Sequence, residues 1–204
     1  MNDMDILPRF KGTLCHDHWK PYYKIDCTHA LCNAHHLREL TRAWEQDGQQ
    51  WAKNMKNLLE TINISVNDAG GALDAKESQK YRRKYRALFK EAEIECPEPI
   101  RPKGKRGRIK KTKSRNLLER LRDYEQDALR FMDNGRVPFS NNLGESDIRM
   151  TKVQQKISGC FRSMDGAQIF CRVRSYLSTC RKQGVKSSHA LDLLFNGKLP
   201  DFLM

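Results

Sequence analysis

Apolar positions at helical spacing run through most of the chain and predict amphipathic helices. The first pattern covers 37–62, with a break at Asp47-Gly48, and 66–71 is expected to be a loop. A second pattern covers 81–92. A third is the cleanest and predicts one continuous helix over 117–133.

Three further helices are expected after residue 140. The first follows a turn at 138–142 and stops at Gly159, and the others cover 167–183 and 188–195. Each offers an apolar stripe for packing, and the last helix has no role beyond core packing. The stripes of the first two helices consist of Leu143, Met150, Val153 and Ile157, and of Phe170, Val173, Leu177 and Cys180.

Two short apolar runs, 13–16 and 29–32, predict buried strands. Asp17 directly follows the carboxyl end of the first run. Residues 18–23 follow as a loop or a broken helix start, in which Pro21 suits a first turn. An acid after a strand, followed by aromatic residues, is found in active sites of α/β folds and also in ordinary turns. The residues alone leave both interpretations open.

The chain is strongly basic, and its excess charge lies in one half. The net charge is +13 over 204 residues. Residues 1–95 hold 15 Lys and Arg against 14 Asp and Glu, whereas residues 96–204 hold 23 against 11. We therefore expect a polyanion to face the second half, and nucleic acid is the favoured class.

The segment 96–115 predicts a flexible basic loop, because prolines and glycines interrupt it and nine cations oppose Glu98 alone. Two roles are open. The favoured one is sequence-independent contact with DNA phosphates, and the other is a solvated linker. The cations expected to contact DNA are Arg101, Lys103, Lys105, Arg106, Arg108, Lys110 and Lys111.

Seven cysteines without a repeating spacing predict reduced thiols in a cytoplasmic protein, not a disulfide framework. Cys32 and His35 form a Cys-x-x-His pair, but a zinc site needs about four ligands and no second pair follows downstream. A packed Cys with a hydrogen-bonded His is the default interpretation, and structural zinc is the alternative. No apolar run is long enough to predict a membrane span.

The positions of two acids, Asp17 and Glu145, suggest a catalytic role. From spacing alone, Glu145 is expected only to form a capping box with Asn142 and to complement the helix dipole. The alternative is that carboxylates from distant segments together hold two Mg²⁺ ions for attack on a phosphodiester. Arg149 and Lys152 share a helical face with Glu145 and would then hold the DNA backbone. Such a site needs a third carboxylate, for which the sequence offers no convincing candidate.

Several long motifs follow one another in a specific order. They are 137–149 with 152–159 and 161–163, Cys15-His16-Asp17-His18-Trp19 with Tyr22 or Tyr23, the stretch 31–40, and the basic loop with 115–118. Together they span essentially the whole chain. In these motifs the chain resembles the TnpC-type DDE transposases of insertion sequence family sixty-six.

The resemblance implies an α/β fold, the C-terminal portion of a ribonuclease-H-like core with a helical insertion, mostly helical in this chain. It also implies DNA transposition by hydrolysis and strand transfer at an Asp, Asp, Glu triad that binds Mg²⁺ or Mn²⁺. Asp17 would be the second acid and Glu145 the third, each a metal ligand. The residues that would shape the Glu145 helix and contact DNA are Asn141, Asn142 and Arg149. The Cys-x-x-His pair resembles a signature that lies outside the metal triad.

The chain departs from the family's pattern before Asp17, where 16 residues stand in place of the strands that carry the first aspartate. We therefore expect a C-terminal part of a transposase that is inactive alone. Its expected domains are core strands at 1–32, a helical insertion with the basic loop at 33–115, and C-terminal core helices at 116–204. Expected partners are the DNA ends of the element and a polypeptide with the missing N-terminal part, or other transposase subunits. The alternatives are a non-catalytic DNA-binding or regulatory fragment, and the product of a decayed gene.

Overall fold

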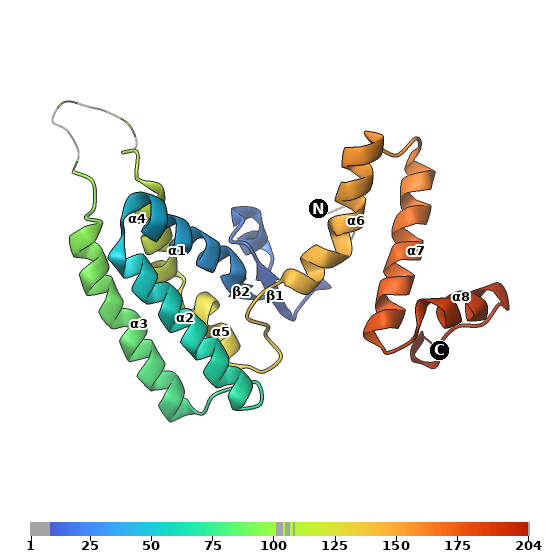
Figure 1. Cartoon of the computed structure of the whole chain (residues 1–204), viewed down its shortest axis with the longest axis horizontal. Coiled ribbons are helices and arrows are strands. Elements are labelled where there is room, and N and C mark those ends of the chain that lie inside the picture. The colour runs from blue at the N-terminus through green and yellow to red at the C-terminus, as the bar shows by residue number, and fades with distance from the viewer. Residues whose placement is uncertain (1–8, 101–103, 105–106, 108, 204) are drawn as a thin grey trace. The chain divides into compact units, whose positions relative to one another are not determined.

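The computed structural model describes residues 9–100, 104, 107 and 109–203. The described chain is mostly helical and has one two-stranded sheet (Figure 1), which confirms the expected α/β class with mostly helical content. It divides into two compact units, Met1–Asn141 and Asn142–Met204. The ribonuclease-H-like core and the domain boundaries at 32 and 115 remain predictions.

The sheet consists of β1 (Thr13–His16) and β2 (Thr28–Leu31), which pair in parallel with Thr13 opposite Thr28. Both predicted strands are therefore confirmed. The connection between them contains a short 3₁₀ helix, η3 (Lys20–Lys24), with Pro21 in its first turn. Proline suits this position because the first turn of a helix needs no donor from its backbone nitrogen.

Two helices follow the sheet, α1 (Asn33–Asp47) and α2 (Gln50–Asp68). Gly48 ends α1 in the left-handed conformation, with φ 67°, as the predicted break requires. The loop predicted at 66–71 is wrong for its first three residues, which belong to α2. The reason is that Val66 is buried and continues the apolar stripe of Leu59 and Ile62 into the core.

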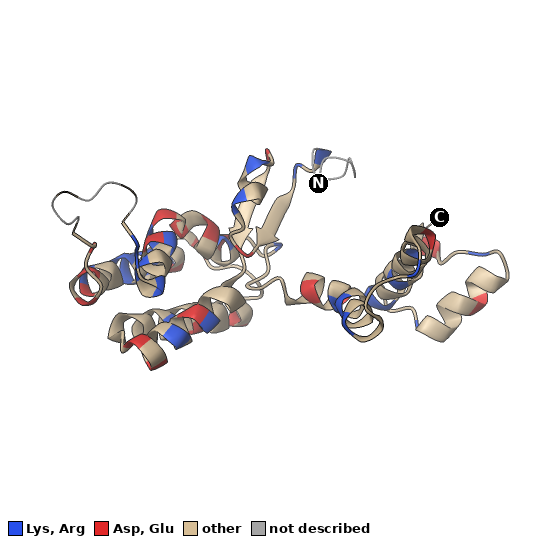
Figure 2. Cartoon of the chain, turned by 90° about the horizontal axis from the view of Figure 1, so that it is seen from above, with Lys and Arg blue, Asp and Glu red and all other residues tan. Residues whose placement is uncertain are grey.

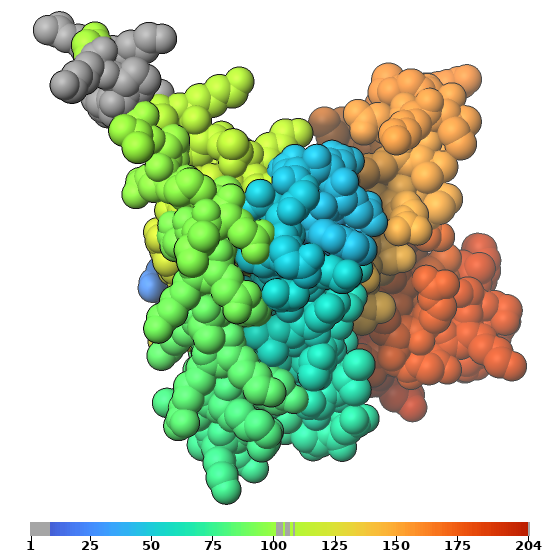
Figure 3. All heavy atoms as spheres, turned by 60° about the vertical axis from the view of Figure 1, so that its left-hand side comes forward, coloured from blue at the N-terminus to red at the C-terminus, as the bar shows by residue number. Residues whose placement is uncertain are grey.

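The next helix, α3 (Ala75–Glu95), begins at Asp74, whose side chain accepts a hydrogen bond from the backbone N–H of Glu77. This is the usual N-cap geometry. Helices α2 and α3 lie side by side along their length (Figure 3). Among the described residues, no helix combines the length and the apolarity that crossing a lipid bilayer requires.

The single helix predicted over 117–133 is wrong, because two helices occupy this stretch: α4 (Lys113–Asp123) and α5 (Glu125–Asp133). They meet at Tyr124, which has φ −115° and ψ 35°. The hydroxyl of Tyr85 donates to the carbonyl of Leu121 at 2.8 Å. In an unbroken helix that carbonyl would accept from the N–H four residues on. The helix break at Tyr124 therefore coincides with the hydrogen bond that Tyr85 of α3 donates to Leu121.

One continuous hydrophobic core joins β2 to helices α1 to α5. Its largest fully buried side chains include Trp51, Tyr85, Leu40, Met55, Leu59, Leu118 and Met132. Helix α5 packs on β2, and α1 packs on both α2 and α4. The sheet is thereby held on a helical body, which fixes the position of the loop that follows β1.

The second unit contains α6 (Asn142–Ser158), α7 (Met164–Lys182), α8 (Ser187–Phe195) and a 3₁₀ turn, η4 (Asp201–Leu203). All three predicted helices are confirmed, and Gly159 ends α6 with φ 75°. The expected core contacts of α7 and α8 are confirmed only in part. Only Cys180 on α7 and Ala190 on α8 are buried, while Val173 is 43% and Phe195 is 85% exposed.

Candidate functional site

Asp17 directly follows β1, and its side chain is exposed. Its Oδ1 accepts a hydrogen bond from the backbone N–H of Trp19 at 3.1 Å. This local bond turns the chain sharply after the strand, because the carboxylate takes the place of a backbone acceptor. Between the two residues, His18 has φ 70°, a left-handed conformation uncommon outside glycine. The predicted strand-end acid is therefore presented to solvent by a tight turn.

A cluster of histidine and tyrosine rings packs beside this turn. Nδ1 of His16 accepts from the backbone N–H of His18 at 3.1 Å, so the proton of the neutral ring lies on Nε2. That Nε2 lies 3.2 Å from Nδ1 of His29, whose Nε2 in turn donates to the carbonyl of Ile25. Burial, followed by the nearby His29, lowers the pKa of His16. Sequence analysis missed the His16–His29 pair, although both residues stand on predicted strands.

The ring of His18 is packed as well. It lies 4.5 Å from the ring of Tyr124 and 5.5 Å from that of Tyr23, both in edge-to-face geometry. Burial, followed by the positive charge of Arg120, lowers the pKa of His18 to about 4. A neutral imidazole is therefore held between the turn and the α4–α5 junction. The strained residue next to Asp17 is fixed by tertiary contacts.

Glu145 lies in the first turn of α6, in the second unit. Asn142 is the first residue of this helix, and Arg149 and Lys152 are exposed on it one and two turns beyond Glu145. The neighbouring acid has a different role: Asp147 accepts from Ser178 of α7 at 2.6 Å and pairs with Lys182. Asp147 thus joins two helices. Since Asp17 belongs to the first unit, its approach to Glu145 stays a prediction.

Cys32 is buried, and its Sγ accepts a hydrogen bond from the backbone N–H of Asn141 at 3.2 Å. The next residue, Asn33, donates its backbone N–H to the carbonyl of Phe139 at 3.0 Å. These two bonds hold the segment 139–141 against the end of β2. The segment leads directly into α6, four residues before Glu145. The Cys-x-x-His motif therefore contains a packed thiol that fixes the chain ahead of the predicted third acid.

Asn33 and His36 form a buried polar pair beside this motif. Nδ2 of Asn33 donates to the carbonyl of Ala128 at 2.9 Å, and its Oδ1 lies 2.9 Å from Nδ1 of His36. Burial, followed by the charge of Arg120, lowers the pKa of His36 to about 3. His36 is thus a neutral donor to Asn33. The spacing of three residues on one helix face was the available signal, and sequence analysis did not use it.

The basic loop lies between α3 and α4. Five of its predicted DNA contacts lie outside the described residues: Arg101, Lys103, Lys105, Arg106 and Arg108. Lys110 is exposed, whereas Nζ of Lys111 lies 2.6 and 2.7 Å from the two carboxylate oxygens of Glu119. The flexible stretch predicted to end at residue 115 is wrong at its end. Helix α4 begins at Lys113 because Thr112 accepts the N–H of Arg115.

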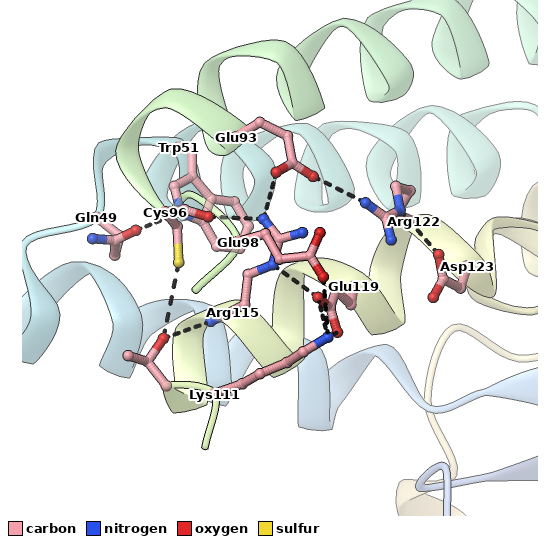
Figure 4. Close-up of polar contacts among 11 residues, drawn as sticks. Gln49, Trp51, Glu93, Cys96, Glu98, Lys111, Arg115, Glu119, Arg122 and Asp123 are labelled. Carbon is pink, nitrogen blue, oxygen red and sulfur yellow. Dashed lines mark hydrogen bonds and ion pairs between the residues drawn. The ribbon is translucent and has the colours of Figure 1, made fainter. Parts of the chain in front are cut away.

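Arg115 forms the base from which this loop extends (Figure 4). Its side chain is 3% exposed. It donates to the carbonyl of Cys96 at 2.9 Å, to Glu119 at 2.8 Å and to Glu93. These contacts link the end of α3 to the start of α4. Both ends of the basic loop are therefore fixed, and the charge of Arg115 is compensated within the protein.

Other cations of the first unit are compensated in the same way. Figure 2 shows basic and acidic positions interspersed along its helices, not separated into one patch. Arg86 binds Glu125 at 2.8 Å, Arg120 binds Glu39 at 2.5 Å, and Arg42 binds Asp47 at 3.0 Å. The large net charge of the sequence thus overstates the cations that are available on this unit to an external polyanion.

Comparison with known proteins shows the family of this chain. Residues 3–169 match the family described as "Transposase IS66 family". The chain belongs to the IS66 transposase family. Among curated proteins, the uncharacterized protein y4jO of Sinorhizobium fredii is 31% identical over 75 residues, a match that covers 37% of this chain and 23% of that protein. No solved structure matches the chain.

Membership of the IS66 transposase family confirms the resemblance noted in the sequence. Transposases act on DNA and generally depend on divalent metal ions. The carboxylate of Asp17 suits such an ion: it is exposed, it supplies the oxygen donors that Mg²⁺ prefers, and its orientation is fixed by Trp19 N–H.

Proposed function

We propose that this chain supplies the second and third carboxylates, Asp17 and Glu145, of a two-metal DNA transposase site. The observation that carries the proposal is the position of Asp17, which is exposed at the carboxyl end of β1 in a parallel strand pair. Ligands of α/β proteins gather at this end of parallel strands. In a member of a transposase family, an acid at such a place is suited to bind the metal that faces DNA.

The same strand pair supports the proposal of a ribonuclease-H-like core. In the core that the resemblance implies, strands carry the second acid, and the third acid follows a helical insertion. Here Asp17 directly follows β1, β2 runs parallel to β1, and Glu145 lies in the first turn of α6 after a long helical insertion. The order of elements therefore agrees with the proposed core and with the proposed roles of both acids.

Each part of the site has a distinct task. Bound Mg²⁺ or Mn²⁺ would activate water or a DNA 3′-hydroxyl for attack on the phosphodiester and stabilise the leaving oxygen. Asp17 and Glu145 would hold the ions, and Trp19 N–H fixes the Asp17 carboxylate. Asn141 and Asn142 would shape the start of α6. Arg149 and Lys152, exposed on α6, would hold the DNA backbone by charge.

A third carboxylate is missing from the described sheet, because neither β1 nor β2 contains an acid. We propose that the third carboxylate comes from outside the residues described here and that these residues alone are inactive. Purified chain should therefore show no Mg²⁺- or Mn²⁺-dependent nicking of the element's DNA ends. Strong nicking that is lost in Glu145→Ala would refute the proposed inactivity.

Metal binding tests the shared site without requiring turnover. Mn²⁺ is titrated into the chain and followed by water-proton relaxation, in wild type, Asp17→Asn, Glu145→Gln and the double variant. If both acids bind the same ions, the double variant should bind Mn²⁺ only slightly less tightly than the single variant that has the lower affinity for Mn²⁺. Asp26→Asn, an exposed acid in the loop after β1, is the matched control and should bind as wild type. Additive losses would place the two acids at separate sites.

A non-catalytic DNA-binding role is the second candidate, and the fixed base of the basic loop favours it. Arg115 and Lys111 fix the described ends of the loop by contacts with Cys96 and Glu119. This role needs the loop but not the two acids. DNA affinity that survives Asp17→Ala and Glu145→Ala, with no metal bound by wild type, would favour this candidate over the first.

A further inference from the structure

Trp19 is an exposed tryptophan two residues beyond Asp17. It is 52% exposed, whereas Trp51 is completely buried and Trp44 packs against the core with Lys53 above its ring. Large aromatic side chains carry most of their stabilising value through burial. A tryptophan left open in a short loop therefore contributes little to folding, and its exposure calls for another explanation.

The turn that presents Trp19 is rigid. Its backbone N–H is bound to Asp17, and the preceding His18 has φ 70° with its ring packed between Tyr23 and Tyr124. Residues held in sparsely populated backbone regions cluster at ligand sites, where surrounding contacts enforce them. The conformation of the turn is thus determined by tertiary packing, and it directs Trp19 away from the core.

The indole is also supported from one side. Its ring lies 5.3 Å from that of Tyr22 at an interplanar angle of 78°, and Tyr22 lies 5.1 Å from the buried His16. Lys20, the next residue, is exposed. An ordered aromatic surface with an adjacent cation is the combination by which proteins bind unpaired nucleic-acid bases, since the ring stacks on the base and the cation attracts the phosphate.

We propose that Trp19 is a stacking platform for an unpaired nucleobase of the DNA strand bound at Asp17. This inference rests on the proposed function in one respect, namely that DNA lies at Asp17. The geometry favours a base over a protein partner, because the exposed ring of Trp19 has a cation, Lys20, and an acid, Asp17, close to it in the chain. Trp19 would hold the strand end open next to the acid while Asp17 faces the phosphate.

The test uses three DNA probes: a blunt duplex, the same duplex with a 3′ overhang of thymidines, and that overhang made abasic. Binding is measured by fluorescence anisotropy in EDTA with the whole chain. Trp19→Ala should weaken binding of the thymidine overhang by about 5- to 100-fold, the range of base–aromatic stacking. It should leave the blunt and abasic probes unchanged. Trp19→Phe should restore most of the affinity, and Trp44→Phe should have no selective effect.

A second readout uses the wild-type protein. Tryptophan emission should be quenched by the thymidine overhang more than by the abasic overhang, and Trp19→Phe should remove that difference. Equal weakening of all three probes by Trp19→Ala, or equal quenching by both overhangs, would overturn the inference. Asp17→Asn separates the two proposals, because stacking in EDTA should survive it. A failure of metal binding at Asp17 with intact base-dependent stacking would refute only the proposed function.

Discussion

The thiol of Cys32 accepts a hydrogen bond from the backbone N–H of Asn141, 109 residues further along the chain. With the bond from Asn33 N–H to Phe139 C=O, it fixes the segment that leads into α6. The sequence motif Cys-x-x-His thus has a structural task at a defined place. It joins the end of the sheet to the chain that carries Glu145, and the folding of this junction depends on buried polar contacts.

Asn33 should be the most sensitive residue of this junction. It is fully buried, and Asn33→Ala would leave the Ala128 carbonyl and the His36 N–H without their partner. We expect a loss of about 2–4 kcal/mol in the free energy of unfolding, since each buried unpaired group costs about 1–3 kcal/mol. Urea denaturation followed by circular dichroism measures it. Asn116→Ala, exposed on α4, should change stability by less than about 0.5 kcal/mol.

Arg115 should stabilise the base of the basic loop. Arg115→Ala removes a nearly buried cation and leaves Glu93, Glu119 and the Cys96 carbonyl without it. The expected loss is about 2–4 kcal/mol in urea denaturation, because the remaining acids lose their compensation. Arg122→Ala is the matched control, since Arg122 also binds Glu93 but is 43% exposed. Its loss should stay below about 1 kcal/mol; equal effects of the two variants would contradict the account.

His36 should make stability depend on pH. Its folded-state pKa, lowered to about 3 by burial, Arg120 and the neighbouring His18 and His35, lies below its ordinary value of 6.5. Below pH 6.5 the unfolded chain binds a proton that the folded chain does not. Stability should therefore fall as pH decreases from 6.5 towards 3, by about 1.4 kcal/mol per pH unit from this group.

The variant His36→Gln isolates this contribution. It retains a donor for Asn33 but cannot titrate, so its stability should decline less steeply between pH 6.5 and 4 than that of wild type. Denaturant midpoints at several pH values measure the slopes. Parallel slopes in the two proteins would show that the His36 ring is not held neutral by the fold.

Lys110 and Lys111 are adjacent, but they should differ in DNA binding. Lys110 is exposed, whereas Lys111 is engaged by Glu119. Lys110→Ala should lower the slope of log affinity against log salt concentration by about 0.9, the value for one phosphate contact. Lys111→Ala should leave the slope nearly unchanged. A larger effect from Lys111→Ala, measured on the same duplex, would show that the Lys111–Glu119 pair opens when DNA binds.

Much of the fold follows from local pattern. Short apolar runs gave β1 and β2, periodic stripes gave the helices, and Gly48 and Gly159 marked where two of them end. The break at Tyr124 could not be predicted in this way, because it accompanies a bond from Tyr85, 36 residues away from its acceptor. The start of α4 was within reach, since Thr112 before a periodic run is a recognisable cap.

The candidate site was predictable only in part. The sequence alone was enough to recognise Asp17 after a strand, the family motifs and the family itself. The spacing of Asn33 and His36 indicated a shared helix face, but it did not indicate their burial, because the Ala128 carbonyl that Asn33 binds comes from another helix. The exposure of Phe195 and Val173 was missed for the converse reason: an apolar stripe does not show whether the unit has enough chain to cover it.

Iron-directed cleavage tests most directly whether Asp17 and Glu145 hold the same metal. Fe²⁺ replaces Mg²⁺ on the chain bound to duplex DNA, and ascorbate with peroxide then cuts the backbone next to the bound ion. We predict two cuts, near residues 17 and 145, both suppressed by excess Mg²⁺ and both lost in Asp17→Asn. A cut near residue 145 that persists in Asp17→Asn, or a cut at one acid alone, would contradict the shared site.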